Sequence, residues 1–293
     1  MSAPEVQVRT NEPPRLKLLP RLRELWRSRE ILANLAKKER KAKYKSTALG
    51  AAWSMLNPLL YLVVFYVVFT VFLPSGIPVF PVYLLSGLLP WTLFSTGLAG
   101  ATVSVTGNAQ LVSKVAFAKE YLPLATIRAQ TVNFFYQFAV LVVFVLVFGY
   151  PLIHKGLVLL PLAFVVLLLF VSAVGMATAA WNVRYRDMGY LVELLLLAWF
   201  WSTPIVYPAA TVLDRLGPTG QFLYLLNPMA NIVLGFQRAV YGGVSGEALR
   251  ELPRLGVTWY GARLLALGAV SLVILYLSWR LFFRNAGDFA EEL

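Results

Sequence analysis

The sequence predicts an all-α membrane protein that crosses the bilayer several times. Of the 293 residues, 59% are hydrophobic and only 14% are charged, and the mean hydropathy is +0.68. Soluble domains contain about 45–50% apolar and about 25% charged residues. The apolar residues form continuous runs of the length that a membrane helix needs, unlike the alternating segments of a β-barrel. These observations exclude an ordinary soluble protein and a disordered chain, and they disfavour a barrel.

Six apolar runs indicate transmembrane helices, and they cover residues 51–73, 78–107, 127–150, 157–181, 190–207 and 257–283. In the second run we expect breaks at Pro81 and Pro90. Its small residues, such as Gly87, favour close helix packing, although they can also be mere filler. The fifth run is short and ends at a pair of prolines.

Basic residues predict the orientation of the chain. The formal net charge is +12, and residues 1–45 hold 13 of the 26 Lys and Arg but only 5 of the 14 Asp and Glu. Basic residues also gather in the loop 108–126 and around Arg184, and such loops face the cytoplasm. Both termini are therefore expected on the cytoplasmic side. Segment 208–256 is then expected on the outer side of the membrane. It is too apolar for a free loop, which favours short re-entrant helices.

The amino-terminal region divides into a tail and a helix. Residues 1–20 contain four prolines and predict a mobile tail, whereas apolar residues recur at helical spacing over 21–45. A basic amphipathic helix of this kind lies in the membrane interface and attracts anionic lipid. It is either a plain anchor or also a docking surface for a cytoplasmic partner, and nucleic-acid binding is disfavoured. The interface residues that we single out are Trp26, Arg29, Lys37 and Arg40.

Catalytic chemistry is missing from the sequence. It contains no cysteine, no G-x-x-x-x-G-K-[ST] loop and no H-E-x-x-H or G-x-S-x-G motif. The single histidine, His154, falls at an outer span end, where a solvated loop residue is the usual interpretation. No acidic residue lies at the centre of a span, which disfavours a proton- or sodium-driven porter. We predict neither a catalytic nor a metal site in this chain, so active transport would need energy from another chain.

Five stretches carry a resemblance to a known family. Residues 44–53 (YKSTALGAAW) and 56–59 (LNPL) resemble the start of the first span in polysaccharide-exporting ABC transporter permeases, with Lys43 where Arg is usual and Thr47 for Ser. Four more stretches follow in the family's order: 108–117 with Glu120 and 122–123, 182–187, 199–208 and 227–229. The chain thus resembles a Wzm-like permease of a type-2 ABC exporter for O-antigen, teichoic acid or cell-wall glycan.

This resemblance implies a set of partners. Two permease copies pair with two cytoplasmic ATPase subunits, which bind ATP and Mg²⁺, and the permease itself holds no cofactor. The substrate is a glycan on undecaprenyl diphosphate, which crosses the bacterial inner membrane. The amino-terminal helix and the loop after the second span contact the ATPase. The alternative is that this loop is an ordinary connection. If it couples to the ATPase, the expected coupling residues are Lys114, Val115, Phe117, Lys119, Glu120 and Leu122.

Aromatic residues suggest where a sugar polymer would pass. Tyr61, Phe65 and Phe69 share one face of the first predicted span, and residues 199–201 read Trp-Phe-Trp. Sugars stack on such rings, so we interpret Tyr61, Phe65, Phe69, Trp199, Phe200 and Trp201 as a candidate channel lining. Helix packing or interfacial belts are the alternative. Rival functions are an ABC permease for a drug or small lipid, a membrane-embedded glycan-processing enzyme and a secondary porter.

Overall fold

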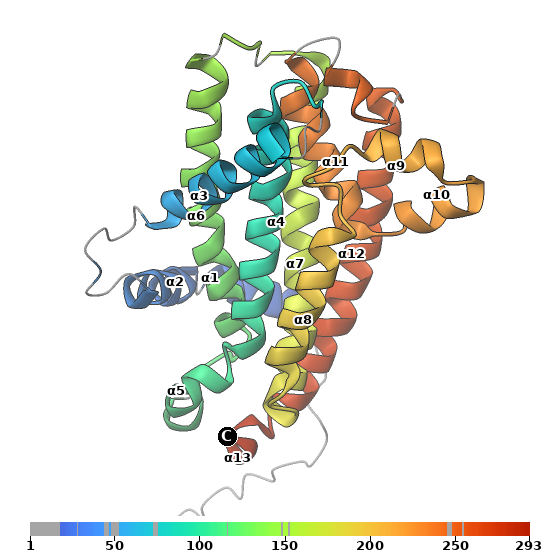
Figure 1. Cartoon of the computed structure of the whole chain (residues 1–293). Helices are drawn as coiled ribbons and strands as arrows, with labels where there is room; N and C mark the ends of the chain where they lie inside the picture. The colour runs from blue at the N-terminus through green and yellow to red at the C-terminus, as the bar shows by residue number, and fades with distance from the viewer. Residues whose placement is uncertain are drawn as a thin grey trace, which may run out of the picture.

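The computed structural model describes residues 18–27, 29–43, 47, 53–72, 76–115, 117–147, 149–151, 153–244, 248–253 and 255–293. Within these ranges every regular element is a helix, as the sequence predicts (Figure 1). Most of the predicted tail, most of residues 44–52 and parts of segment 208–256 lie outside the description. The side chain of Trp26 lies outside it as well.

Four long helices form the body of the protein. Among the described residues, α4 (Phe80–Val103), α6 (Tyr121–Val147), α7 (Leu159–Arg184) and α12 (Val257–Asn285) are long and apolar enough to cross a membrane. A helix of 24 residues spans about 36 Å, more than the roughly 30 Å of a hydrocarbon core. They stand side by side (Figure 1), with α12 against α7 and α4 against both α6 and α7. This bundle is that of a multi-pass membrane protein.

Two apolar helices are shorter. The first, α3 (Trp53–Val67), continues into the π-helical turn η2 (Val68–Phe72) and lies obliquely across the upper part of α4 and α6 (Figure 1). The second, α8 (Met188–Trp201), runs along α4 and is about 21 Å long. The first falls within the first predicted span, 51–73, whereas α8 begins two residues before the fifth predicted span, 190–207, and ends at Trp201.

The expected break at Pro90 is wrong, because α4 continues through it. Pro81 lies in the first turn of α4, where its missing N–H costs no helical bond. Pro90 lies inside the helix and is buried. It is tolerated because α4 is the most enclosed of the long helices, with α6, α7, α8 and α11 around it, and neighbouring helices hold such a site in shape.

The chain bends sharply after α8, and this bend is buried. Residues 203–206 have almost no solvent exposure although they are not helical. The side-chain amide of Gln237 donates to the Pro204 carbonyl at 2.9 Å, and the Tyr83 hydroxyl donates to the Tyr207 carbonyl at 2.6 Å. Two buried polar side chains therefore satisfy carbonyl groups that no helix satisfies.

A group of short helices follows the bend and closes one end of the bundle. It comprises α9 (Ala209–Arg215), α10 (Pro218–Leu225), α11 (Pro228–Val240), η5 (Tyr241–Gly243) and η6 (Ala248–Arg250). Helix α11 is buried between α4, α7 and α12, while α10 projects sideways (Figure 1). Arg263 of α12 holds this group in place, because its guanidinium donates to the Leu225 carbonyl and to Asn231 Oδ1, both at 2.6 Å. The 3₁₀ turn η4 (Lys155–Val158) lies at the same end and contacts α11.

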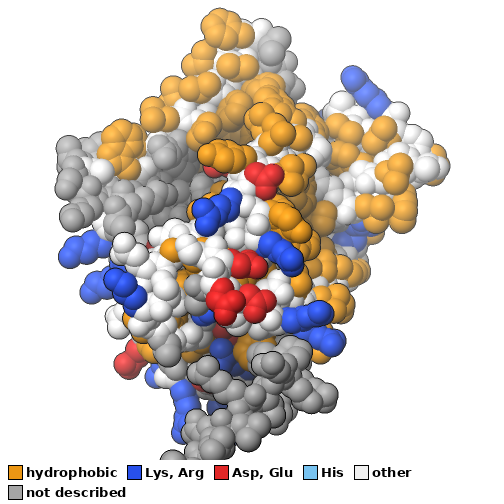
Figure 2. All heavy atoms as spheres, turned by 90° about the horizontal axis from the view of Figure 1, so that it is seen from below, with side chains coloured by type: hydrophobic (Ala, Val, Ile, Leu, Met, Phe, Trp, Pro, Cys, Tyr) orange, Lys and Arg blue, Asp and Glu red, His pale blue; other side chains and the backbone are white. Residues whose placement is uncertain are grey.

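The opposite end carries the remaining helices, and we call it the basic end. It comprises α1 (Leu18–Arg27), α2 (Arg29–Lys43), η3 (Thr106–Asn108), α5 (Ala109–Lys114) and α13 (Phe289–Glu292). Helices α1 and α2 lie across the bundle axis (Figure 1). Figure 2 shows this end from below, with Lys and Arg spread around it, a few acidic side chains near the middle and apolar side chains on the flanks.

The buried bend gives a prediction for Gly87 of α4. A Cβ atom at Gly87 would meet the Gln237 amide nitrogen at 3.0 Å and Val233 at 3.2 Å. We expect Gly87→Leu to destabilise the fold by about 1–3 kcal/mol through overpacking. The measurement is the thermal midpoint of the monodisperse protein in detergent. Gly107→Leu is the control, because nothing lies within 4 Å of a Cβ atom there; equal shifts for both variants would contradict the prediction.

Candidate coupling end and aromatic cluster

The predicted interface helix consists of two helices in the structure, α1 and α2. Helix α2 packs on α6 through three buried alanines, Ala36 against Ala125 and Ala129. Small side chains allow two helix backbones to approach closely. Leu32 and Leu35 cover the margins of this contact. The apolar face of α2 is therefore fixed on the bundle.

The basic side chains of α2 surround that contact. Arg29 and Lys37 are exposed and Arg40 is half-buried. Lys38 donates to Asn108 Oδ1 at 3.3 Å, which joins α2 to the turn before α5. Of the predicted interface residues, Arg29 and Lys37 are thus exposed cations beside this contact, Arg40 is partly covered, and the side chain of Trp26 is not described.

An ion pair ties α1 to the connection between α5 and α6 (residues 115–120), which holds several of the predicted coupling residues and which we call the coupling loop. The Arg21 Nε donates to Glu120 Oε1 at 2.6 Å, and Glu120 is only 1% exposed. Arg21 also pairs with Glu24 at 2.6 Å, and its guanidinium lies 5.2 Å from the ring centroid of Phe283 in α12. The hydrogen bond to Glu120 raises the pKa of Arg21. One guanidinium therefore connects α1, the loop and the end of α12.

The carboxyl-terminal segment holds the same loop from the other side. Lys119 Nζ donates to the Ala286 carbonyl at 2.6 Å and lies 5.7 Å from the ring centroid of Phe289. Burial lowers the pKa of Lys119. Phe289 of α13 is buried edge-on against Phe282 at 5.2 Å. The coupling loop is thus clamped between the first and last described helices.

The six predicted coupling residues differ in their exposure to solvent. Lys114 and Val115 are exposed at the end of α5, Val115 to 49%. Phe117 and Lys119 are half-buried, and Glu120 and Leu122 are buried, so those two side chains act within the protein rather than on its surface. A groove of about 580 Å³ lies between α2 and α5 and is lined by Lys38, residues 106–111, Lys114 and Val115. Of the six predicted residues, Lys114 and Val115 are therefore the exposed pair, and both line this groove.

The six predicted channel aromatics belong to one cluster. Phe65 stacks on Tyr61 and on Phe200, each at 6.2 Å between centroids, and lies 6.2 Å from Phe69. Phe200 also contacts Trp201 at 5.4 Å. Tyr61 is 57% exposed, so this part of the cluster opens onto the outside of the single chain, between α3 and α8.

Trp199 lies in another part of this cluster, among packed helices. Its ring meets Phe94 at 5.1 Å and Phe170 at 6.1 Å, and its indole N–H donates to Asn227 Oδ1 at 2.8 Å. Trp201 is 55% exposed on the far side of the same helix. The structure therefore places Trp199 toward α4 and α7 and Trp201 toward the surface.

Three residues have structural contacts that the sequence analysis does not predict, although two of them, Asn182 and Asn227, lie in its motif stretches. Asn227 accepts from the N–H groups of Met229 and Ala230, which caps α11, and it also donates to the Ser202 carbonyl at 3.1 Å. Asn182 donates to Thr106 and accepts from the Gly189 N–H at 3.1 Å, which joins α7 to η3 and α8. The Asn-Pro pair signals the first cap. The sequence does not indicate that Arg21 pairs with Glu120, because the acidic residue nearest to Arg21 in the sequence is Glu24.

Apolar helices long enough to span a bilayer, with a basic end and shorter helices closing the other, define a multi-pass α-helical membrane protein. The chain belongs to the ABC-2 type transporter family, because the sequence model of that family matches residues 31–241. This confirms the family resemblance that the sequence motifs carry.

Its relatives are named as export permeases. Over 273 residues the chain is 33% identical to the O-antigen export system permease protein RfbA of Myxococcus xanthus, covering 93% of this chain and 98% of the relative. Two proteins of the same name from Klebsiella pneumoniae are 28% and 26% identical. Each match covers 73% of this chain and 81% or 82% of the relative.

The ion pair between Arg21 and Glu120 gives a second prediction. Arg21→Gln leaves a buried carboxylate without its partner, so we expect a loss of about 1–3 kcal/mol in stability. The double variant with Glu120→Gln should recover part of that loss, which a double-mutant cycle on thermal midpoints measures. Arg23→Gln is the control, since Arg23 is exposed on the same helix. Additive effects in the cycle would show that the two side chains do not interact.

Proposed function

We propose that this chain is the permease subunit of a bacterial polysaccharide exporter. The observation that carries the proposal is the 33% identity to an O-antigen export permease over nearly the whole length of both chains. The bundle fits this function because several of its helices are long and apolar enough to cross a membrane. The sequence contains no G-x-x-x-x-G-K-[ST] nucleotide-binding loop. We propose a transport subunit and not an enzyme.

In the proposed topology six helices cross the inner membrane. These are the four long helices with α3 and α8, and the buried bend after α8 shortens the stretch that helix α8 has to cover. The basic end faces the cytoplasm, because Lys and Arg concentrate there. Both termini then lie inside, α1 and α2 lie in the interface, and α9 to η6 form the outer re-entrant segment.

The proposed partners are a second copy of this chain and two cytoplasmic ATPase subunits, which bind ATP and Mg²⁺. Apolar side chains such as Tyr61, Val64, Leu194 and Leu197 are exposed on α3 and α8. We assign these faces to the contact with the second copy and to the path between the copies. The ATPase would contact the groove between α2 and α5, where Lys114 and Val115 are accessible.

The proposed substrate is a glycan on a polyprenyl diphosphate lipid, such as an O-antigen, galactan or teichoic-acid type polymer. A sliding polymer needs loose contacts, and the stacked rings of Tyr61, Phe65, Phe200 and Trp201 supply apolar faces on α3 and α8. ATP-driven closure of the partner would push α5. Because Lys119 and Glu120 are clamped by both chain ends, the push would reach α4, α6 and α12 together.

A deletion strain tests the proposed function. Loss of this gene should remove the surface polysaccharide and leave lipid-linked glycan inside the cell, and the intact gene should restore export. The measurement is surface glycan by antibody or lectin binding, with intracellular lipid-linked glycan by mass spectrometry. A normal surface glycan together with lost drug or lipid export would support the rival ABC permease instead.

The docking surface has its own test. We expect Lys114→Glu to reduce the amount of ATPase subunit that co-purifies with the chain several-fold, because it reverses an exposed charge at the edge of the groove. Arg184→Glu is the matched control, since Arg184 is exposed at the same end but does not line the groove. Undiminished co-purification of the Lys114 variant would contradict docking at α5.

A further inference from the structure

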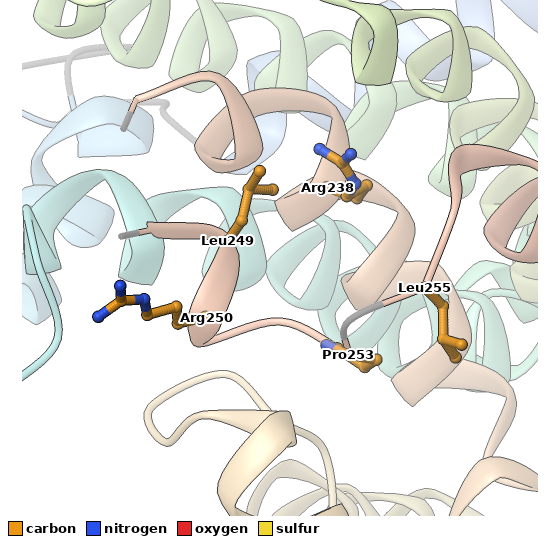
Figure 3. A pocket seen from close by; sticks show the side chains of 5 residues that line it. All are labelled: Arg238, Leu249, Arg250, Pro253 and Leu255. Atoms are coloured by element: carbon orange, nitrogen blue, oxygen red, sulfur yellow. The ribbon is translucent and has the colours of Figure 1, made fainter. Parts of the chain in front are cut away.

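A pocket with two arginines lies at the end opposite the basic end. Its lining residues are Arg238, Leu249, Arg250, Pro253 and Leu255, and its volume is about 580 Å³. Figure 3 shows Arg238 beside Leu249 on one side, Pro253 and Leu255 on another, and Arg250 extending from the end of η6. Ligand pockets have volumes of about 300–1,000 Å³. The pocket therefore has the size of a ligand site, with both cationic and apolar walls.

The positions of these walls are fixed by neighbouring contacts. The Tyr260 hydroxyl donates to the Pro253 carbonyl at 2.8 Å, which anchors the loop before α12. Gly242 has no side chain, and a Cβ atom there would meet the Arg238 guanidinium at 2.6 Å, so the guanidinium lies over the backbone of η5. Trp259 is half-buried in the first turn of α12, and an aromatic ring at the end of a membrane helix is typical of the membrane interface. In the proposed topology the pocket therefore lies at the level of the lipid head groups.

Neither arginine has an anionic partner within the described part of the chain. The ion pairs found there all involve Arg21. Glu251 follows Arg250 but does not line the pocket. The ring of His154 accepts from the Gly156 N–H at Nδ1, and its Nε2 lies 3.0 Å from the Ala239 carbonyl. Burial lowers the pKa of His154, and the charge of Arg238 adds to this. Arginines are also unusual on the outer side of a membrane protein. The presence of two arginines without an anionic partner in one pocket therefore favours an anionic ligand.

We propose that this pocket binds the phosphate groups of a lipid head group at the outer membrane surface, and that the occupant is the polyprenyl diphosphate carrier of the exported glycan. The inference rests on the proposed function for its direction and its substrate. Arg238 would hold one phosphate deep in the pocket, and the exposed Arg250 would close over the other. Guanidinium groups bind phosphate oxygens with two parallel hydrogen bonds. Leu249, Pro253 and Leu255 would cover the first carbons of the lipid.

The apolar wall is the reason to choose a lipid over free phosphate. An inorganic anion gains nothing from Leu249, Pro253 and Leu255, whereas an amphipathic lipid buries carbon there. A diphosphate offers an anionic group to each arginine once the exposed Arg250 side chain, which points away from the pocket in Figure 3, turns toward it. The single phosphodiester of a bulk phospholipid offers one anionic group. The site would capture the carrier lipid when its head group reaches the outer surface.

The test uses the chain co-purified with its ATPase in phosphatidylcholine nanodiscs, with binding measured by native mass spectrometry. The probes are undecaprenyl diphosphate, phosphatidylglycerol and inorganic pyrophosphate. We expect undecaprenyl diphosphate to bind, Arg250→Gln to weaken it about tenfold, and Arg238→Gln to weaken it further. Arg238→Lys separates charge from the bidentate fork and should give an intermediate loss. Arg215→Gln, an exposed outer arginine outside the pocket, should change nothing.

Several results would overturn the assignment. Unchanged binding in both Arg238→Gln and Arg250→Gln would place the lipid elsewhere, and an equal loss in Arg215→Gln would show a general charge effect. Displacement by equimolar phosphatidylglycerol would make the pocket a bulk-lipid site. Equal affinity for inorganic pyrophosphate would remove the role of the apolar wall.

The outcome also separates this inference from the exporter function. If the intact gene restores surface polysaccharide but the purified complex does not prefer undecaprenyl diphosphate, the site fails and the exporter stands. If the arginines bind that lipid but deletion leaves the surface polysaccharide unchanged, the exporter assignment fails and the site stands.

Discussion

A backbone that lies in hydrocarbon has to satisfy its own hydrogen bonds, and the rest of this structure depends on that constraint. Helices meet it along α4, α6, α7 and α12. The bend after α8 does not, because residues 203–206 are buried without being helical. The side chains of Tyr83 and Gln237 take over there by donating to the carbonyls of Tyr207 and Pro204. Two polar residues inside an apolar bundle are therefore required by the geometry of the chain.

The same requirement explains how the helix ends are joined. Asn182 bonds to the Gly189 N–H at the start of α8, and Asn227 bonds to the Trp199 indole and the Ser202 carbonyl at its end, so α8 is fixed at both ends. At the basic end, the charged pair of Arg21 and Glu120 and the bond from Lys119 to Ala286 hold the loop before α6. Polar contacts are thus concentrated at the helix ends, where they fix the position of one helix relative to another. A displacement of α5 would be transmitted through these contacts instead of being absorbed by a flexible loop.

Run length and periodicity predict the helices well, because an apolar run of bilayer length has few alternatives. They fail at Pro90, where the enclosure of α4 by its neighbours outweighs the lost hydrogen bond. They also fail to separate Trp199 from Trp201, which are two residues apart on one helix and face opposite surroundings. That separation depends on where α4 and α7 lie. Likewise Glu120 looks like a surface contact residue until Arg21, 99 positions earlier, is seen to bind it.

The charges inside the bundle bear on how transport is driven. Arg263 is the charged residue of α12 nearest the short helices, and it donates to a carbonyl and an amide oxygen instead of a carboxylate. An arginine does not give up its proton in a protein, so this contact is structural and cannot relay protons. Glu120 is buried but lies at the basic end, where its partner Arg21 keeps it part of an ion pair. The buried charges of the described residues therefore hold helices together. This agrees with the proposal that the driving force comes from an ATPase partner at the basic end.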